Sequence, residues 1–124
     1  MTIESGWCEI KLTADRVAVL ELHRDHDLGT MDDVSAAFDE LAAAQRDVVV
    51  DLGHTTFLDS AAIHTIYGFA TRQSDAGKRL ALCVGPESSV RRVLEVVGLL
   101  ERVPWADDLE SAIALLRGEE RVRG

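Results

Sequence analysis

The most continuous hydrophobic pattern in the chain lies near its middle. Residues 48–50 are all valine and lead into Asp51 and, two positions later, Gly53. A β-branched run that ends at a glycine is typical of a strand buried on both faces. We therefore predict a central strand here, followed by a short polar loop and a helix that begins near Ser60.

Three other segments have the pattern of strands. Apolar and polar positions alternate over residues 7–13, and residues 17–22 are more continuously apolar, so we predict an antiparallel hairpin with one polar face. Residues 79–84 predict a further strand. Residues 99–103 predict a short edge strand or extended segment that Pro104 stops.

Four segments have apolar residues at spacings of three and four, which predicts amphipathic helices. Their predicted packing faces are, in chain order, Val34, Ala37, Phe38, Leu41 and Ala42; Ala62, Ile63, Ile66, Tyr67, Phe69 and Ala70; Val90, Val93, Leu94 and Val97; and Leu109, Ala112, Ile113 and Leu116. Gly77 and Gly98 should end the second and third helices, because glycine is favoured in the left-handed position after a helix. Asp107 or Asp108 should cap the fourth.

The order of these elements indicates one α/β domain. Helical crossovers force neighbouring strands to be parallel, whereas the first hairpin is antiparallel, so the sheet should be mixed. We expect four to five strands, with about four helices grouped mainly on one side. The domain should span residues 1–118, and residues 119–124 should form a charged tail.

Size and charge narrow the possible partners. The chain has 124 residues and a net charge of −9 at pH 7, which argues against nucleic acid or an anionic membrane surface and favours a partner with a basic patch. No apolar run approaches the roughly 20 residues of a membrane span, and no signal peptide is evident. We expect a cytoplasmic protein in which Cys8 and Cys83 are reduced, with a disulfide between them as the alternative.

The polar segment 23–27 holds two histidines and two aspartates, a composition that raises the possibility of a metal site. No further His or Cys cluster stands at ligand spacing, so we expect a solvated loop and neither a metal nor a cofactor.

Ser60 is the main candidate for chemistry. At or beside the N-cap of a helix its hydroxyl faces unpaired backbone N–H groups, so an ordinary cap and a phosphorylation site are both open. A hydrolase that uses Ser60 with His64, one turn away, lacks the Gly-x-Ser-x-Gly motif, and we expect no enzyme activity. Asp51 is placed like the acceptor of a receiver domain, but the acidic pair and lysine of such a site do not appear.

Two segments together resemble the STAS domains, specifically the anti-sigma-factor antagonists. The family signature is a buried strand ending in Asp-Leu, a loop, an apolar pair, then Asp-Ser, a small residue and glycine, and residues 48–62 follow it. Residues 29–36 match a second family pattern, Gly-x-apolar-Asp-x-x-Ser/Thr-Ala. Ala62 replaces the family glycine, and we expect its methyl group to narrow a partner's approach. Ala61 replaces a frequent second hydroxyl, which leaves Ser60 as the sole acceptor in the motif.

The resemblance implies partner switching. The unphosphorylated module would bind an anti-sigma factor that is also a serine kinase, phosphorylation would separate the two, and a serine phosphatase would reset the cycle. By position, Ser60 would be the acceptor and Asp59 would support its loop, while Asp32, Ala61 and His64 would join them on the partner-facing surface. A scaffold subunit of a larger signalling assembly is the alternative.

Overall fold

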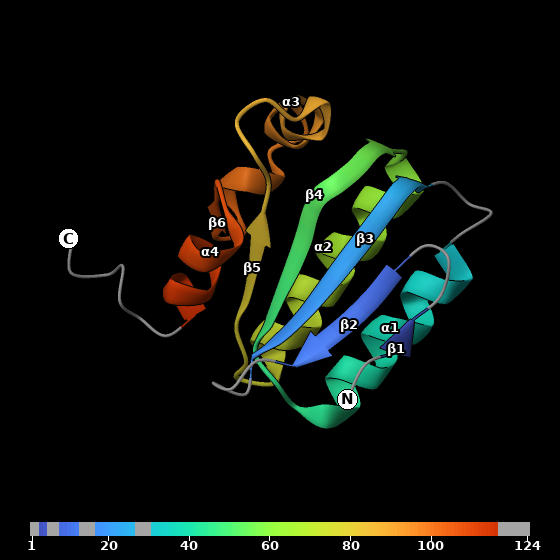
Figure 1. The fold of residues 1–124 in the computed structure, drawn as a ribbon. Coiled ribbons are helices and arrows are strands. Elements are labelled where there is room, and N and C mark those ends of the chain that lie inside the picture. Colours follow the sequence, from blue (N-terminus) through green and yellow to red (C-terminus); the bar gives the residue numbers. More distant parts are fainter. Residues whose placement is uncertain (1–2, 5–7, 13–16, 27–30, 117–124) are drawn as a thin grey trace.

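The computed structural model describes residues 3–4, 8–12, 17–26 and 31–116 (Figure 1). The strands are β1 (Ile3–Glu4), β2 (Cys8–Leu12), β3 (Ala18–His26), β4 (Val48–Leu58), β5 (Leu80–Cys83) and β6 (Trp105–Ala106). The helices are α1 (Met31–Ala44), α2 (Ser60–Asp75), α3 (Ser89–Val96) and α4 (Leu109–Leu116), with a short 3-10 helix, η1 (Leu99–Glu101). No helix in these ranges is long and apolar enough to cross a membrane.

The six strands form one mixed sheet in the order β1-β2-β3-β4-β5-β6. The first three strands pair antiparallel, and the remaining pairs are parallel. This confirms the predicted single α/β domain with a mixed sheet. The two edge strands have only two residues each, so the predicted four to five strands undercount the sheet by its shortest members.

The two central strands are longer than predicted. β3 continues to His26 and β4 to Leu58, because beyond the apolar runs the two backbones still pair with each other. The Thr55 hydroxyl also donates a hydrogen bond of 2.6 Å to the Leu22 carbonyl. The expected loops after residues 22 and 53 were therefore wrong; of the polar segment 23–27, only residue 27 lies outside the described residues.

The predicted strand over residues 99–103 was also wrong. Leu99–Glu101 form η1, and the edge strand β6 comes after Pro104 rather than before it. Proline lacks an N–H group but keeps its carbonyl, which accepts a 2.9 Å hydrogen bond from the Leu82 N–H and so begins the pairing with β5.

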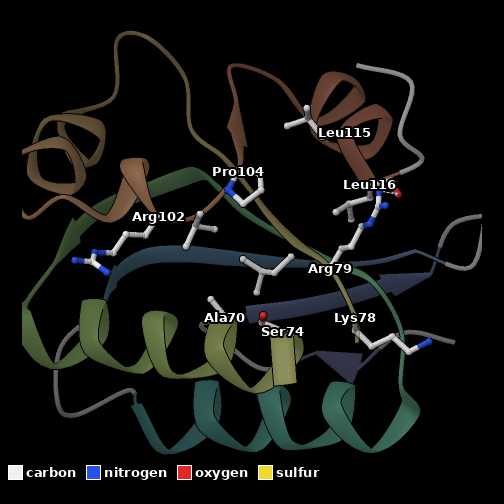
Figure 2. A pocket seen from close by; sticks show the side chains of 10 residues that line it. Ala70, Ser74, Lys78, Arg79, Arg102, Pro104, Leu115 and Leu116 are labelled. Carbon is white, nitrogen blue, oxygen red and sulfur yellow. Dashed lines mark hydrogen bonds between the residues drawn. The ribbon is translucent and has the colours of Figure 1, made fainter. Parts of the chain in front are cut away.

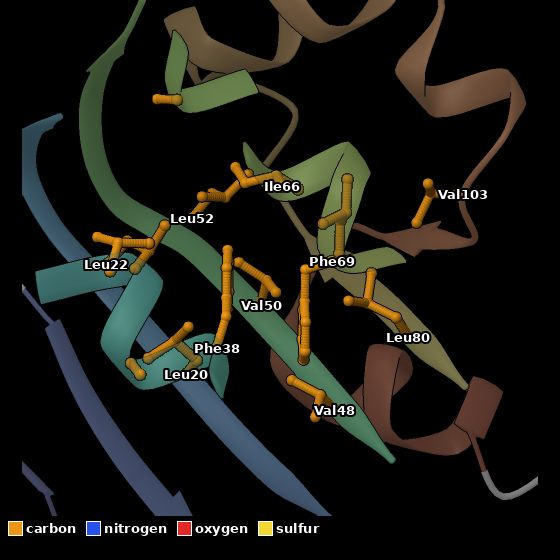
Figure 3. Close-up of a cluster of buried hydrophobic side chains, with 14 of the residues drawn as sticks. Leu20, Leu22, Phe38, Val48, Val50, Leu52, Ile66, Phe69, Leu80 and Val103 are labelled. Atoms are coloured by element: carbon orange, nitrogen blue, oxygen red, sulfur yellow. The ribbon is translucent and has the colours of Figure 1, made fainter. Parts of the chain in front are cut away.

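Alternation along the strands divides the interior into two cores. In β4, Val48, Val50 and Leu52 face the larger core under α1, α2 and α3 (Figure 3). Val49 faces the smaller core under α4. The rings of Phe38 and Phe69 stack with their centroids 4.3 Å apart, which joins α1 to α2. α1, α2 and α3 lie on one face of the sheet and α4 lies on the other, which confirms the expectation of helices mainly on one side.

Helix ends follow the predicted chemistry. Gly77 and Gly98 have φ values of 74° and 81°, the left-handed conformation expected after α2 and α3. Of the two candidates at the fourth helix, Asp108 is the cap, because its carboxylate accepts a 2.7 Å hydrogen bond from the Ser111 N–H.

Candidate functional site

Ser60 is the first residue of α2, at the edge of the sheet where the parallel strands β3 and β4 end. The N-cap is Asp59, whose Oδ1 accepts a 2.8 Å hydrogen bond from the Ala62 N–H. The interpretation of Ser60 as the helix cap was therefore wrong. Because Asp59 caps the helix, the Ser60 hydroxyl is not needed for capping and is available for other chemistry.

The Ser60 side chain is exposed and does not enter the core. Within the described ranges its hydroxyl has no hydrogen bond, and the Ser60 and Ala61 N–H groups also lack an acceptor. N–H groups at this end of a helix carry the positive end of the helix dipole and are suited to an anion.

An open depression of about 450 Å³ lies beside this hydroxyl. We call it the Ser60 depression; its lining residues are Ser60, Ile63, His64 and Tyr67 from α2, and Val97, Leu99 and Arg102 from the segment after α3. Sequence spacing places the α2 residues on one helix face, but no sequence pattern links them to Arg102. The depression is therefore a product of tertiary structure.

An apolar patch adjoins the Ser60 depression. Tyr67, Val93, Val96 and Val97 are 39%, 38%, 74% and 53% exposed, and they are the exposed large hydrophobic residues of the described part of the chain. The prediction that Tyr67, Val93 and Val97 pack inward was wrong. α3 has only eight residues and buries the narrow stripe of Val90 and Leu94, leaving its other apolar face open.

The other residues predicted for the site or its motif are Asp32, Ala61, Ala62 and His64. Asp32 lies in the first turn of α1, which follows β3, but its side chain is outside the described part. His64 is exposed, Ala61 is half-buried, and no hydrogen bond joins His64 to Ser60 among the described contacts. Ala62 is fully buried in the larger core, so the expectation that its methyl group narrows a partner's approach was wrong.

Asp51 lies on the other face of the sheet, toward α4, where it is 7% exposed and accepts a 2.8 Å hydrogen bond from the Gly53 N–H. Burial, together with Asp51 and the nearby Asp107 and Asp108, raises the pKa of Cys83 to about 12, so this thiol stays protonated at neutral pH. Because the Asp51 carboxylate is buried, it is poorly placed to accept a phosphoryl group as the aspartate of a receiver domain does.

A cluster that the sequence did not predict surrounds Asp51. Glu21, Asp51 and His54 bring their side-chain ligand atoms within 4.8 Å of one another. A β-bulge in the pairing of β3 with β4 places His54 beside Asp51, although strict alternation would put them on opposite faces. The Lys11 ammonium group lies 3.0 Å from the Glu21 carboxylate and offsets part of its charge.

A second pocket, of about 490 Å³, lies between the end of α2 and the end of α4 (Figure 2). Its basic residues do not converge: Lys78 and Arg102 extend in opposite directions, and Arg79 donates a 3.3 Å hydrogen bond to the Leu116 carbonyl. None of the predicted site residues lines this pocket.

The sequence profile of the STAS domain family matches residues 10–112, which is most of the chain. The chain belongs to the STAS domain family. A search of curated proteins found no significant match.

Solved structures agree on the STAS fold. An anti-sigma factor antagonist from Mycobacterium paratuberculosis is similar at 19% identity and a TM-score of 0.79, covering 94% of this chain and 93% of that one. A STAS domain protein from Planctomyces limnophilus has 21% identity and a TM-score of 0.73, with coverage of 89% and 97%. The Bacillus protein SpoIIAA in its phosphorylated form has 16% identity and a TM-score of 0.64, with coverage of 86% and 96%.

Proposed function

We propose that this STAS domain is an anti-sigma-factor antagonist that phosphorylation of Ser60 switches off. The main support for the proposal is that capping and a free hydroxyl belong to two different residues at the start of α2. Asp59 caps the helix, and the Ser60 hydroxyl is exposed beside the Ser60 depression. The similarity to anti-sigma-factor antagonists, one of them solved in a phosphorylated form, supports the same function.

The proposed partner is an anti-sigma factor that is also a serine kinase, and a serine phosphatase reverses the reaction. The apolar patch of Tyr67, Val93, Val96 and Val97 next to Ser60 is a surface that a protein partner can cover. In this proposal the domain acts by binding its partner and catalyses no reaction. It acts in the cytoplasm.

A phosphoryl group at Ser60 is compatible with the fold. It adds about −1.5 to −2 charges, which the N-terminus of α2 tolerates. Phosphorylation should therefore change the affinity for the anti-sigma factor and leave the fold intact. One like-charge contact at ~4 Å and an effective dielectric of ~20 costs about 4 kcal/mol, or roughly a thousandfold in affinity.

The test is to incubate the protein with the anti-sigma-factor kinases of the source cell, map the modified residue by mass spectrometry and measure partner binding. We expect phosphorylation at Ser60, none in Ser60→Ala, and intact binding of that variant. Ser60→Asp carries less charge than phosphoserine, so we expect it to lose about a hundredfold or more in affinity.

Ser74→Asp is the matched control, because Ser74 is exposed near the far end of the same helix and the substitution adds the same charge. It should bind like the wild type. Equal binding by the Ser60→Asp and Ser74→Asp variants, or modification at another residue, would contradict the proposal.

A further inference from the structure

We propose that the phosphoryl group on Ser60 is held by this chain itself, through an ion pair with Arg102 across the Ser60 depression. This inference rests on the proposed function and adds a residue from outside the family motif. Arg102 would act as a positioning residue that sets where the phosphoryl group lies.

The two residues reach the same space from opposite walls. Ser60 begins α2, and Arg102 follows η1, where its backbone N–H donates a 3.0 Å hydrogen bond to the Leu99 carbonyl. Both side chains line the Ser60 depression and both residues are exposed. The Arg102 guanidinium and a phosphoryl group on Ser60 therefore border one shared, open space.

The Arg102 guanidinium is free to form an ion pair, unlike the guanidinium groups of Arg72 and Arg91. Arg72 pairs with Asp39 at 2.9 Å, and Arg91 pairs with Asp107 at 3.0 Å. Within the described part of the chain, no carboxylate or carbonyl accepts a hydrogen bond from the Arg102 side chain. Forming a new ion pair there would break no existing one.

Other groups act on the same phosphoryl group. The Ser60 and Ala61 N–H groups lack acceptors and favour an anion at this end of α2. His64, on the next turn of α2, lines the same depression. Asp59 opposes the pair, although its carboxylate is already bonded to the Ala62 N–H.

The position of the phosphoryl group would add to the switch. Paired with Arg102, it would cross the apolar floor of the depression, which includes Ile63, Tyr67 and Val97. A partner would then lose apolar contact area as well as meet a negative charge.

The experiment uses the full chain with phosphoserine incorporated at position 60 during synthesis, so that it needs neither the kinase nor the partner. The pKa of the second ionisation of the phosphoryl group is measured by a ³¹P NMR titration. A neighbouring guanidinium stabilises the dianion, so we expect this pKa to be about 0.5 unit lower in the wild type than in Arg102→Gln.

Arg92→Gln is the control, since Arg92 is an exposed arginine of α3 that does not line the depression. It removes the same charge and should leave the pKa close to that of the wild type. Equal pKa values in the Arg102 and Arg92 variants would overturn the ion pair. That result would leave partner switching at Ser60 untouched, because the kinase and binding assays test it separately.

Discussion

Gln73 is the buried polar residue that ties the far end of α2 to the sheet. It is 2% exposed, and its side-chain amide donates hydrogen bonds to the Arg46 carbonyl at 2.8 Å and to the Arg79 carbonyl at 3.2 Å. These carbonyls precede β4 and β5, so one side chain links α2 to the start of both strands. A buried polar group is stable only when it is paired in this way.

Gln73→Leu keeps a similar volume but removes both donors. We expect the free energy of unfolding to fall by about 1–3 kcal/mol, because the Arg46 and Arg79 carbonyls each lose a partly buried hydrogen bond. Urea denaturation followed by circular dichroism measures the change. Ser74→Ala, at the exposed neighbouring residue, should change stability by less than about 0.5 kcal/mol, and similar losses in both variants would count against this role of Gln73.

At the scale of elements, the start of α2 has a structural residue and a functional candidate side by side. Asp59 has extended backbone angles, φ −87° and ψ 177°, and its carbonyl accepts the first helical hydrogen bond from the Ile63 N–H. Ser60 is already inside the helix. Mutation can therefore test the capping role of Asp59 separately from the proposed role of Ser60.

Asp59→Ala should lower the free energy of unfolding by about 1 kcal/mol, because the Ala62 N–H loses its acceptor. Asp59→Asn removes the charge but keeps the cap, so it should cost only a few tenths of a kcal/mol. Thermal and chemical denaturation of both variants check this. If the alanine variant were as stable as the asparagine variant, Asp59 would not be the stabilising cap described above.

At the scale of the whole molecule, the sheet separates two cores of unequal size. The smaller core, which α4 covers, contains Val19, Val49 and Leu116, and the larger core contains Leu94 of α3. The Ser60 depression lies on the side of the larger core, since Ile63 of its lining packs against that core. Changes under α4 should therefore affect stability without reaching the site.

Leu116→Ala and Leu94→Ala test this separation. Both remove a buried leucine, and we expect each to lower the free energy of unfolding by about 2–4 kcal/mol. Amide chemical shifts of Ser60 and Leu99 should move in the Leu94 variant, because α3 and η1 pack together, and stay close to wild-type values in the Leu116 variant. Equal shifts in the two variants would show that the cores are coupled.

Local chemistry explains what could be predicted from the sequence. The valine run of β4, the positions of the four helices and the left-handed glycines 77 and 98 follow from short-range features, and each is where the pattern places it. The Asp-Ser pair was also visible, but spacing alone did not show which of the two residues caps α2. The cap depends on the backbone angles of Asp59, which the preceding strand sets by running on to Leu58.

Tertiary structure decided the rest. The polar ends of β3 and β4 are strands because each supplies the other's hydrogen-bond partners, a long-range effect that apolar periodicity does not record. The bulge that brings His54 to Asp51 follows from the same pairing. The sequence by itself determined the family, the main elements and the candidate serine; only the folded chain brought Arg102 and the apolar patch of α3 to that serine, because residues far apart in sequence meet only through packing.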